Sequence, residues 1–352
     1  MILHVMDETF TYKGRIENYR SLRWKEQYQG KGMFTMIVDD TEQNATMLKR
    51  GRILFRGDRK TAMLIVKITR NSEDNTIHLY GHTTLEFLSR RVIIGPYSVT
   101  NVEGSIYTMF LENKRGLTWI GNSNSESLPD KLEEAQEVKD AEMLPKFLEL
   151  CEMADLGLKI DCDYRNKLQS LKVYQGRDLS YKEGKGGMVF SVEFGNMLSV
   201  TIDEDDSIWK NICYVRGVKN DTNSTEILIE VGESEPHERR EMIINGSIQE
   251  KNQSAADYEA QLIAEGKKAL QEYYDVTNFT AEISPEKLGT AFDLGDLVTC
   301  NATRYGVRFD ARITEFEEDI ELGFRKVYIT MGKPTITYAK AILAQAKKGK
   351  VK

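Results

Sequence analysis

Two distant segments of the sequence follow the same order of strand-like and glycine positions. They read LKRGRILFRGDRKTAMLIVKITRNSEDNTIHLYGH at 48–82 and FDLGDLVTCNATRYGVRFDARITEFEEDIELGFRKVYITMG at 292–332. Each has a glycine opening a strand, an alanine-led strand ending in Ile-Thr, an acidic turn, and a strand closing on glycine: Gly51, Ile68-Thr69 and Gly81; Gly295, Ile313-Thr314 and Gly332. The glycine-to-isoleucine spacing is 17 and 18 residues. Such self-similarity indicates one small barrel used twice, or a chance match of short strand patterns.

Strand-like patterns dominate the whole chain. Alternation or short β-branched runs predict strands at 33–38, 61–70, 76–81, 171–175, 188–193, 212–217, 226–231, 297–303 and 324–331. Apolar residues at helical spacing predict helices at about 141–156 and 255–274, and a shorter one after Ser105. No Gly/Ser/Pro-rich linker separates the halves, so we expect packed or interleaved domains. The fold class is α+β, mostly β.

Composition excludes several classes of protein. The chain has 352 residues, 40% of them hydrophobic and 29% charged, which is typical of a globular protein and rules out disorder and collagen. Its apolar runs are far shorter than the ~20 residues that a bilayer requires, and a signal peptide is lacking, so we expect folding in the cytoplasm without a membrane anchor. A net charge of −7 disfavours nucleic-acid binding. Four cysteines without a Cys-x-x-Cys pair predict buried free thiols.

The segment IHLYGHTTLEFLSRR presents a possible zinc site. His78 and His82 are four residues apart, with Glu86 four further on, which is a metal-binding pattern on a helix. Residues 76–81 alternate like a strand, however, and a helix is expected only after Thr83 or Thr84. Residues four apart on a strand are ~13 Å from each other. We therefore predict that these histidines bind no metal.

Other chemical motifs are incomplete. The turn at 184–187 lacks the residues of a phosphate-binding loop, and the DEDD run at 203–206 lacks the glycine and distal glutamate of a calcium loop, which favours a solvated turn. The carboxylates of EFEEDIE at 315–321 are spaced along a strand or hairpin with no evident proton donor. We predict no catalytic residues, no cofactor and no metal, and hence not an enzyme.

An ordered set of segments resembles a known family. These segments are SLRWKEQYQGKGMFTMIVDDTEQNATMLKRGRILFRG, IHLYGHTTLEFLSRRVI, LPKFLELCEMADLGLKI, VYQGRDLSYKEGKGGMVFSVEFGNMLSVTIDEDDSIWKNICYVRG and LGDLVTCNATRYGVRFDARITEFEEDIELGFRKVYITMGKP. In this order they resemble the baseplate hub proteins of tailed bacteriophages, most closely the siphophage N-terminal structural part of tail-associated lysins. No single segment is a tight signature, so the resemblance rests on their order.

The resemblance implies a structural protein of the virion tail tip. Such hubs are homotrimers with two tube-like β-barrel domains per subunit and smaller α/β domains outside. A trimer of duplicated barrels would adapt a sixfold tail tube to threefold symmetry. The implied partners are the distal tail protein, the tail tube ring and the tape measure protein, with DNA passing through the channel without specific binding. A separate spike or fibre protein could dock at the C-terminus.

The resemblance also implies domain boundaries that no linker marks in the sequence. Residues 1–95 would form the first barrel and 96–197 an α/β domain. The second barrel would combine 198–232 with 286–335, around an inserted α/β domain at 233–285. Residues 336–352 would form a C-terminal helix or tail.

Oppositely charged strands are candidates for the contacts between subunits. RGDRK at 56–60 and EFEED at 315–319 could pair across an interface, which singles out Arg56, Arg59, Glu315, Glu317 and Glu318. Two alternative functions remain open at this stage, a peptidoglycan hydrolase and a host-surface carbohydrate-binding module. The three tryptophans are far apart in sequence, which disfavours an aromatic sugar platform.

Overall fold

The computed structural model describes most of the chain in two compact units. Unit 1 comprises Met1–Thr201 and Phe279–Gly332, and unit 2 is formed around residues 202–278. The described residues are 1–206, 209–219, 224–246, 254–271, 276–284, 288–321 and 323–332. The expected C-terminal helix or tail at 336–352 lies outside them.

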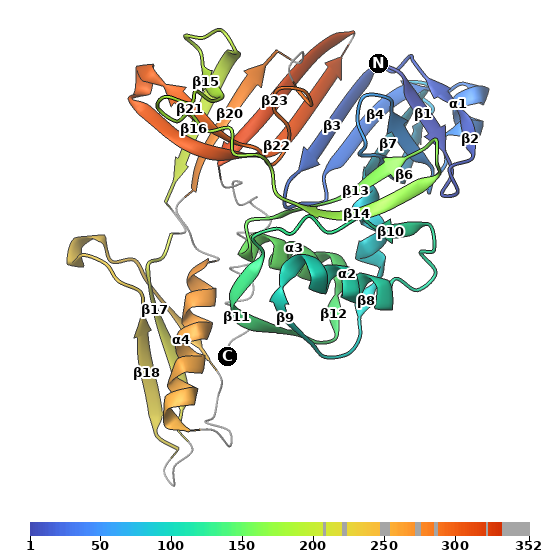
Figure 1. Cartoon of the computed structure of the whole chain (residues 1–352). Helices are drawn as coiled ribbons and strands as arrows, with labels where there is room; N and C mark the ends of the chain where they lie inside the picture. Colours follow the sequence, from blue (N-terminus) through green and yellow to red (C-terminus); the bar gives the residue numbers. More distant parts are fainter. Residues whose placement is uncertain are drawn as a thin grey trace. The chain divides into compact units, whose positions relative to one another are not determined.

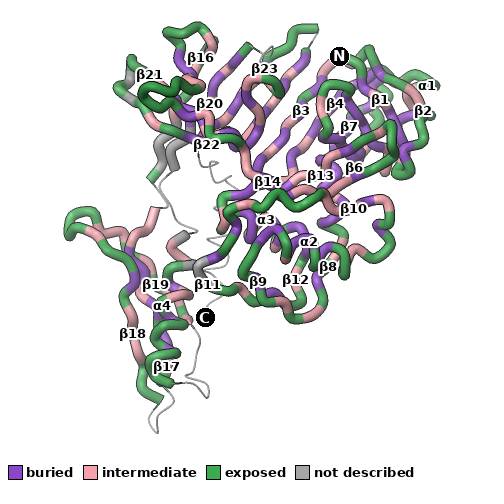
Figure 2. Tube along the Cα trace, viewed as in Figure 1, coloured by how far each residue is buried: buried purple, intermediate pink, exposed green. Residues whose placement is uncertain are grey.

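The first half of unit 1 is a meander of antiparallel strands. In chain order its elements are β1 (Leu3–Met6), β2 (Tyr12–Ile16), β3 (Ser21–Gln27), β4 (Met33–Asp39), α1 (Glu42–Met47), β5 (Ile53–Arg56), β6 (Met63–Asn71) and β7 (Thr76–Thr83). They are hydrogen-bonded in the order β3-β4-β7-β6-β5-β1-β2. Buried and partly exposed residues alternate along β3 and β4, as expected for strands with one face on the core (Figure 2).

The second half repeats this arrangement. Its strands are β15 (Val189–Ser191), β16 (Met197–Asp205), β20 (Val276–Ile283), β21 (Leu297–Ala302), β22 (Val307–Glu321) and β23 (Phe324–Gly332), with a short 3-10 helix, η4 (Thr303–Tyr305). The order β16-β20-β23-β22-β21 matches β3-β4-β7-β6-β5 strand for strand (Figure 1). Strands β3 and β22 are paired, which joins both halves into one 13-stranded sheet.

Backbone hydrogen bonds align the two copies residue by residue. Gly51 N donates to Ile65 O at 2.9 Å, and Gly295 N donates to Ile313 O at 2.8 Å. Both glycines have positive φ, 84° and 91°, a conformation that favours glycine. The register shifts immediately after both isoleucines, between Ile65/Lys67 and between Ile313/Glu315. Ile313 therefore corresponds to Ile65, three residues before the Ile68 that the sequence pattern indicated.

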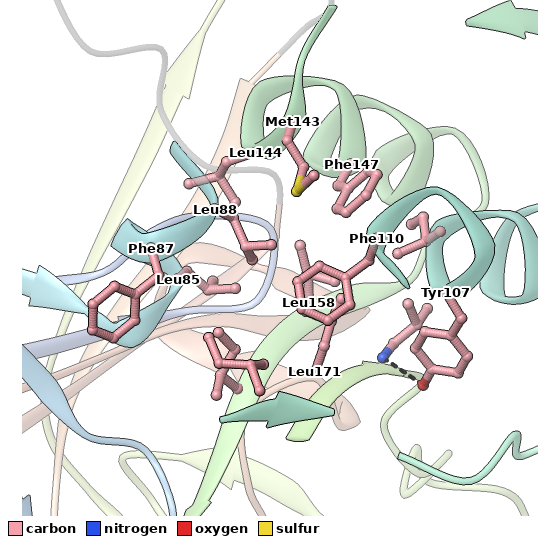
Figure 3. Close-up of a cluster of buried hydrophobic side chains, with 14 of the residues drawn as sticks. Leu85, Phe87, Leu88, Tyr107, Phe110, Met143, Leu144, Phe147, Leu158 and Leu171 are labelled. Atoms are coloured by element: carbon pink, nitrogen blue, oxygen red, sulfur yellow. Dashed lines mark hydrogen bonds between the residues drawn. The ribbon is translucent and has the colours of Figure 1, made fainter. Parts of the chain in front are cut away.

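An α/β domain separates the two repeats. It contains η1 (Thr84–Arg90), β8 (Val92–Ile93), β9 (Tyr97–Asn101), α2 (Val102–Asn113), β10 (Ile120–Asn122), β11 (Lys131–Val138), β12 (Ala141–Glu142), α3 (Met143–Met153), β13 (Gly157–Asp163) and β14 (Leu168–Tyr174). Side chains from η1, α2 and α3 meet those of β13 and β14 in one apolar core (Figure 3). The Tyr107 hydroxyl accepts a hydrogen bond from Val173 N at 3.1 Å, which satisfies a polar group inside this core.

Unit 2 is a three-stranded sheet with one helix. Its elements are β17 (Ile212–Val218), β18 (Glu226–Val231), the 3-10 helix η2 (Pro236–Glu238), β19 (Glu241–Asn245) and α4 (Ala255–Gln271). The strand order is β18-β17-β19, and Tyr258 and Leu262 of α4 are buried against Cys213, Val215 and Val231 of the sheet. In the chain, the elements β17 to α4 come between β16 and β20, which is where the first repeat has only the short turn between β3 and β4.

The described structure confirms the α+β, mostly β class and differs from several expectations. Strands β17 and β18 belong to unit 2, whereas the expected second barrel included them up to residue 232, because they pair with β19 and pack on α4. The acidic residues 315–321, for which a turn, strand or hairpin was expected, lie within the long strand β22. Residues 203–205, which were expected to form a solvated turn, end strand β16. The described strands of the two repeats form one continuous sheet instead of two separately closed barrels.

Candidate functional site: the seam between the two repeats

The two repeats meet at the antiparallel pairing of β3 with β22. Cα partners run from Ser21↔Glu321 to Gln27↔Glu315. Because successive side chains on a strand point to opposite faces, this pairing produces two rows of charged residues, one buried and one partly exposed. We call this pairing the in-chain seam.

The buried row is centred on Arg56 of β5. Its guanidinium contacts Glu318 of β22 at 2.7 Å and Asp58 at 2.7 Å, and lies over the Trp24 ring at 5.3 Å. The side chains of Arg56 and Glu318 are 1% and 0% exposed. Arg325 of β23 contacts the other carboxylate oxygen of Glu318 at 2.6 Å. Removing either partner would leave the other charge buried without a counter-ion. Loss of this pair should therefore destabilise the junction of the two repeats.

Arg59 forms a second buried contact across the seam. Its guanidinium donates to both carboxylate oxygens of Glu26 at 2.8 and 3.0 Å and to Asp293 of the second repeat at 3.1 Å. It also lies 4.9 Å from the centre of the Phe316 ring. Burial opposes ionisation of Glu26, but the charge and hydrogen bonds of Arg59 outweigh it and hold the pKa of this carboxyl below its usual value.

The opposite face of the same strands bears cross-strand ion pairs, and we call it the open face. Arg23 contacts Asp319 at 2.8 Å and Glu317 at 3.2 Å, and Lys25 contacts Glu315 at 2.9 Å. These side chains are 17–53% exposed. Each cation on the open face of β3 therefore has a carboxylate partner, which leaves little positive charge to attract an anion.

The five candidate subunit contacts all lie at this seam. Arg56 and Glu318 pair with each other within the chain, and Arg59 pairs with Glu26 and Asp293. Glu315 and Glu317 lie on the open face beside Lys25. A role of these residues in contacts between subunits stays a prediction. The sequence interpretation missed Arg23, Lys25 and Glu26. The available signal was the alternation of SLRWKEQ, in which Arg23 and Lys25 fall on one face and Glu26 shares the other with Leu22 and Trp24.

Two strands equivalent to those of the seam, β16 and β6, each have an edge that is not paired in this way. Strand β16, which corresponds to β3, is at one end of the sheet. Strand β6, which corresponds to β22, pairs with β7 along its whole length, but with the β5 side only at 63–65. Among the described strands, none pairs with the edge of residues 66–71 that faces away from β7. The equivalent stretch of β22 is paired with β3.

The histidines of β7 and the four cysteines contact neighbouring protein groups. His78 and His82 lie on β7, where His78 Nε2 is 3.1 Å from Thr76 Oγ1 and His82 Nδ1 is 2.9 Å from Gly32 O. No group of three or more His, Cys, Asp or Glu in the described part of the chain could hold a metal ion. All four cysteines are buried free thiols, as predicted. None of the described helices is long and apolar enough to cross a membrane.

Comparisons with known proteins agree with this duplicated fold. It is similar to the crystal structures of the prophage MuSo2 43 kDa tail protein from Shewanella oneidensis (TM-score 0.62, 11% identity, 94% of this chain and 98% of that chain) and a tail protein from Neisseria meningitidis MC58 (TM-score 0.58, 9% identity, 96% and 98%). It also resembles prophage tail protein gp18 from Listeria monocytogenes EGD-e (TM-score 0.54, 14% identity, 99% of both chains). A search of curated proteins found no match.

The fold is therefore that of phage tail proteins. The model of the Siphovirus ReqiPepy6 Gp37-like protein family matches residues 2–104 and 142–333, and the chain belongs to that family. The predicted relationship to phage tail proteins is thus confirmed.

Proposed function

We propose that this chain is the homotrimeric baseplate hub that closes the distal end of the tail tube. The observation that carries the proposal is the in-chain seam, where one repeat pairs with the next through β3 and β22. Strand β16 corresponds to β3 and β6 corresponds to β22, but β16 and the outer half of β6 each have an edge without a partner among the described strands. These two edges can form the same pairing with further copies of the chain. Three chains would then supply six similar units around one axis.

This arrangement would adapt the symmetry of the tail. A ring of six similar units matches a sixfold tube above it, whereas unit 2, which interrupts only the second repeat, occurs three times. The two repeats would form tube-like β-domains that close into a barrel only in the assembly. This differs from two barrels closed within one chain and agrees with the one sheet that the described strands of both repeats share.

The open face would line the channel through which DNA leaves. Its cations are paired with carboxylates, and the chain as a whole carries a net charge of −7. Such a surface would not retain phosphates, because retention requires cations that displace the counterions of DNA. DNA would therefore pass without specific binding, and the protein would act as a structural component rather than as an enzyme.

The hub position implies neighbours on both sides of the ring. The tail tube ring and the distal tail protein would contact one end, and the tape measure protein would enter the channel. A separate spike or fibre protein could dock near the C-terminal residues. The barrel boundaries within 1–95 and the second repeat, and the location at the tail tip, belong to the same proposal.

Mass measurement tests the proposal directly. Light scattering of the purified chain should give three times the 40.3 kDa of one subunit. End-on electron micrographs should show six peripheral lobes around a central channel. A monomer or dimer at every concentration, or rings with two or four lobes, would refute the hub. A clear band on a peptidoglycan zymogram would instead favour the hydrolase alternative.

A further inference from the structure

Equivalent positions in the two repeats carry opposite charges at the seam. The alignment of Gly51 with Gly295 and of Ile65 with Ile313 fixes three further pairs. Lys49 corresponds to Asp293, Arg52 to Asp296, and Lys67 to Glu315. The second repeat is thus acidic where it receives β3, and the first repeat is basic at the same three places.

The basic side of the first repeat borders a groove. The groove, about 550 Å³ in volume, lies between α1 and β2 and is lined by residues that include Lys13, Glu42, Met47, Lys49 and Arg52. Asp293, the residue equivalent to Lys49, borders a much smaller cavity of about 30 Å³, with Gln27 of β3 and Gly30 of the β3–β4 turn among its lining residues.

The basic edge retains charge for a partner. Lys49 and Lys67 are exposed, and neither has an acidic side chain within ion-pair distance in the described part of the chain. Arg52 and Lys13 both contact Asp7, at 3.5 and 2.9 Å. An acidic strand end placed beside this edge would gain favourable interactions with two free cations.

Strand β16 has the complementary features. Its sequence, MLSVTIDED, ends in Asp203, Glu204 and Asp205. Leu198 is 65% exposed, on the face opposite to Met197, which is 2% exposed. An apolar side chain this exposed on an unpaired edge strand marks an interaction surface.

We propose that β16 of one copy pairs with the outer edge of β6 in a second copy of this chain, with its acidic end beside Lys49 and Lys67. The inference rests on the proposed trimer and specifies its interface. The contact repeats the in-chain seam with reversed polarity, since there the basic strand β3 meets the acidic strand β22.

The charges also determine which free edges can pair. The outer edge of β6 beside the same edge of another copy would bring the lysines of both copies together, and β16 beside β16 would bring two acidic strand ends together. Both wrong pairings set like charges against each other, whereas β16 beside β6 sets opposite charges together.

Charge reversal with compensation tests the interface. The double variant Lys49→Glu with Lys67→Glu should raise the protein concentration at which half the trimer has dissociated by about tenfold or more, as measured by analytical ultracentrifugation. Adding Asp203→Lys and Asp205→Lys in the same chain should restore assembly. The matched control, Lys139→Glu with Lys185→Glu, makes the same charge change at two other exposed lysines and should leave assembly unchanged.

Cysteine cross-linking gives an independent measurement. Variants that carry Thr69→Cys on β6 together with Ser199→Cys or Thr201→Cys on β16 should form covalent oligomers on mild oxidation. The native cysteines are buried, so the wild-type chain should not cross-link under the same conditions. A wild-type trimer that neither responds to charge reversal nor cross-links would overturn this interface and leave the hub standing. A wild-type chain that stays monomeric would overturn both proposals.

Discussion

At the scale of single residues, the seam depends on arginines that are buried with their carboxylate partners. Arg56 is almost fully buried yet contacts Glu318, Asp58 and the Trp24 ring, so its charge is compensated on several sides. A buried pair is weak evidence for stability, because desolvating both charges costs much of what their attraction provides. Losing one partner is different, since the remaining charge stays buried.

Substitution of Arg56 should therefore be far more harmful than substitution of an exposed arginine. We expect Arg56→Ala to lower the free energy of unfolding by about 3–5 kcal/mol, because Glu318 is left buried beside only Arg325. The control Arg20→Ala breaks an exposed pair with Asp39, 50% and 57% exposed, and should cost about 1 kcal/mol or less. Urea denaturation measures both, and equal losses would contradict a structural role of the buried pair.

Glu26 should make stability depend on pH in the acidic range. Its pKa in the folded chain lies below the value of about 4.3 expected when unfolded, so its ionised form stabilises the fold above that pH. This contribution is lost as the pH falls through the lowered pKa. We expect Glu26→Gln to be less stable than wild type at pH 7, with the difference shrinking on acidification.

Trp24 provides the signal for that measurement. Its indole donates to Glu26 at 2.9 Å, so tryptophan fluorescence in urea titrations at several pH values should report unfolding near the seam. The exposed control Glu8→Gln should follow wild type throughout. A gap between Glu26→Gln and wild type that stays constant down to pH 3 would argue against a lowered pKa.

The seam residues show how much of the candidate site could be predicted at this scale. Opposite charge on two strands pointed to Arg56, Arg59 and Glu318, which do lie together. Sequence charge alone does not distinguish pairing within a chain from pairing between chains, because the distance across a fold depends on topology. Arg23, Lys25 and Glu26 were missed because a strand rich in charged residues also fits a solvated surface.

At the scale of elements, the duplicated meander was recognisable because glycine and strand periodicity are local properties. The offset at Ile65 was not, since Gly51 and Ile65 are 14 residues apart whereas Gly295 and Ile313 are 18 apart, and only the backbone hydrogen bonds reveal which isoleucines correspond. The length of β22 was missed for a related reason. Its acidic residues fitted a turn, a strand or a hairpin equally well, and in the fold they are stabilised in a strand by Arg23 and Lys25 on β3.

A close contact at the start of β13 should be intolerant of a methyl group. A Cβ at Gly157 would lie 2.3 Å from the Tyr28 ring, and one at Gly295 would lie 2.5 Å from the same ring. Tyr28 is fully buried and donates to Asp155 O at 3.1 Å, so the ring has little room to move. We expect Gly157→Ala to cost about 1–3 kcal/mol of stability.

A second glycine of the same sheet is the matched control. Gly121 lies on β10, and the nearest atom to a Cβ there is 4.0 Å away. Gly121→Ala should change stability by about 0.5 kcal/mol or less. Thermal unfolding of both variants measures the difference. A melting temperature of Gly157→Ala equal to that of Gly121→Ala would show that the Tyr28 ring can move away from the added methyl group.

At the scale of the whole molecule, net charge conceals how the charges are distributed. The chain is acidic overall, yet the open face pairs each cation of β3 with a carboxylate of β22, and the outer edge of the first repeat is basic. Composition predicted weak binding to nucleic acid. The location of the paired and unpaired charges depends on which strands are neighbours, and that could not be read from the sequence.

Removing the carboxylates of the open face should convert it into a surface that binds DNA. The triple variant Glu315→Gln, Glu317→Gln, Asp319→Asn leaves Arg23 and Lys25 without acidic partners on β22. We expect its affinity for short duplex DNA to rise on the order of tenfold, and to fall steeply between 50 and 200 mM salt, because each phosphate contact releases counterions. The control Glu8→Gln, Glu137→Gln, Glu152→Gln changes net charge equally at exposed sites elsewhere. Fluorescence anisotropy measures both variants. Equal affinities would mean that net charge, and not pairing on the open face, sets the response to DNA, and the argument for this face as the channel lining would fail.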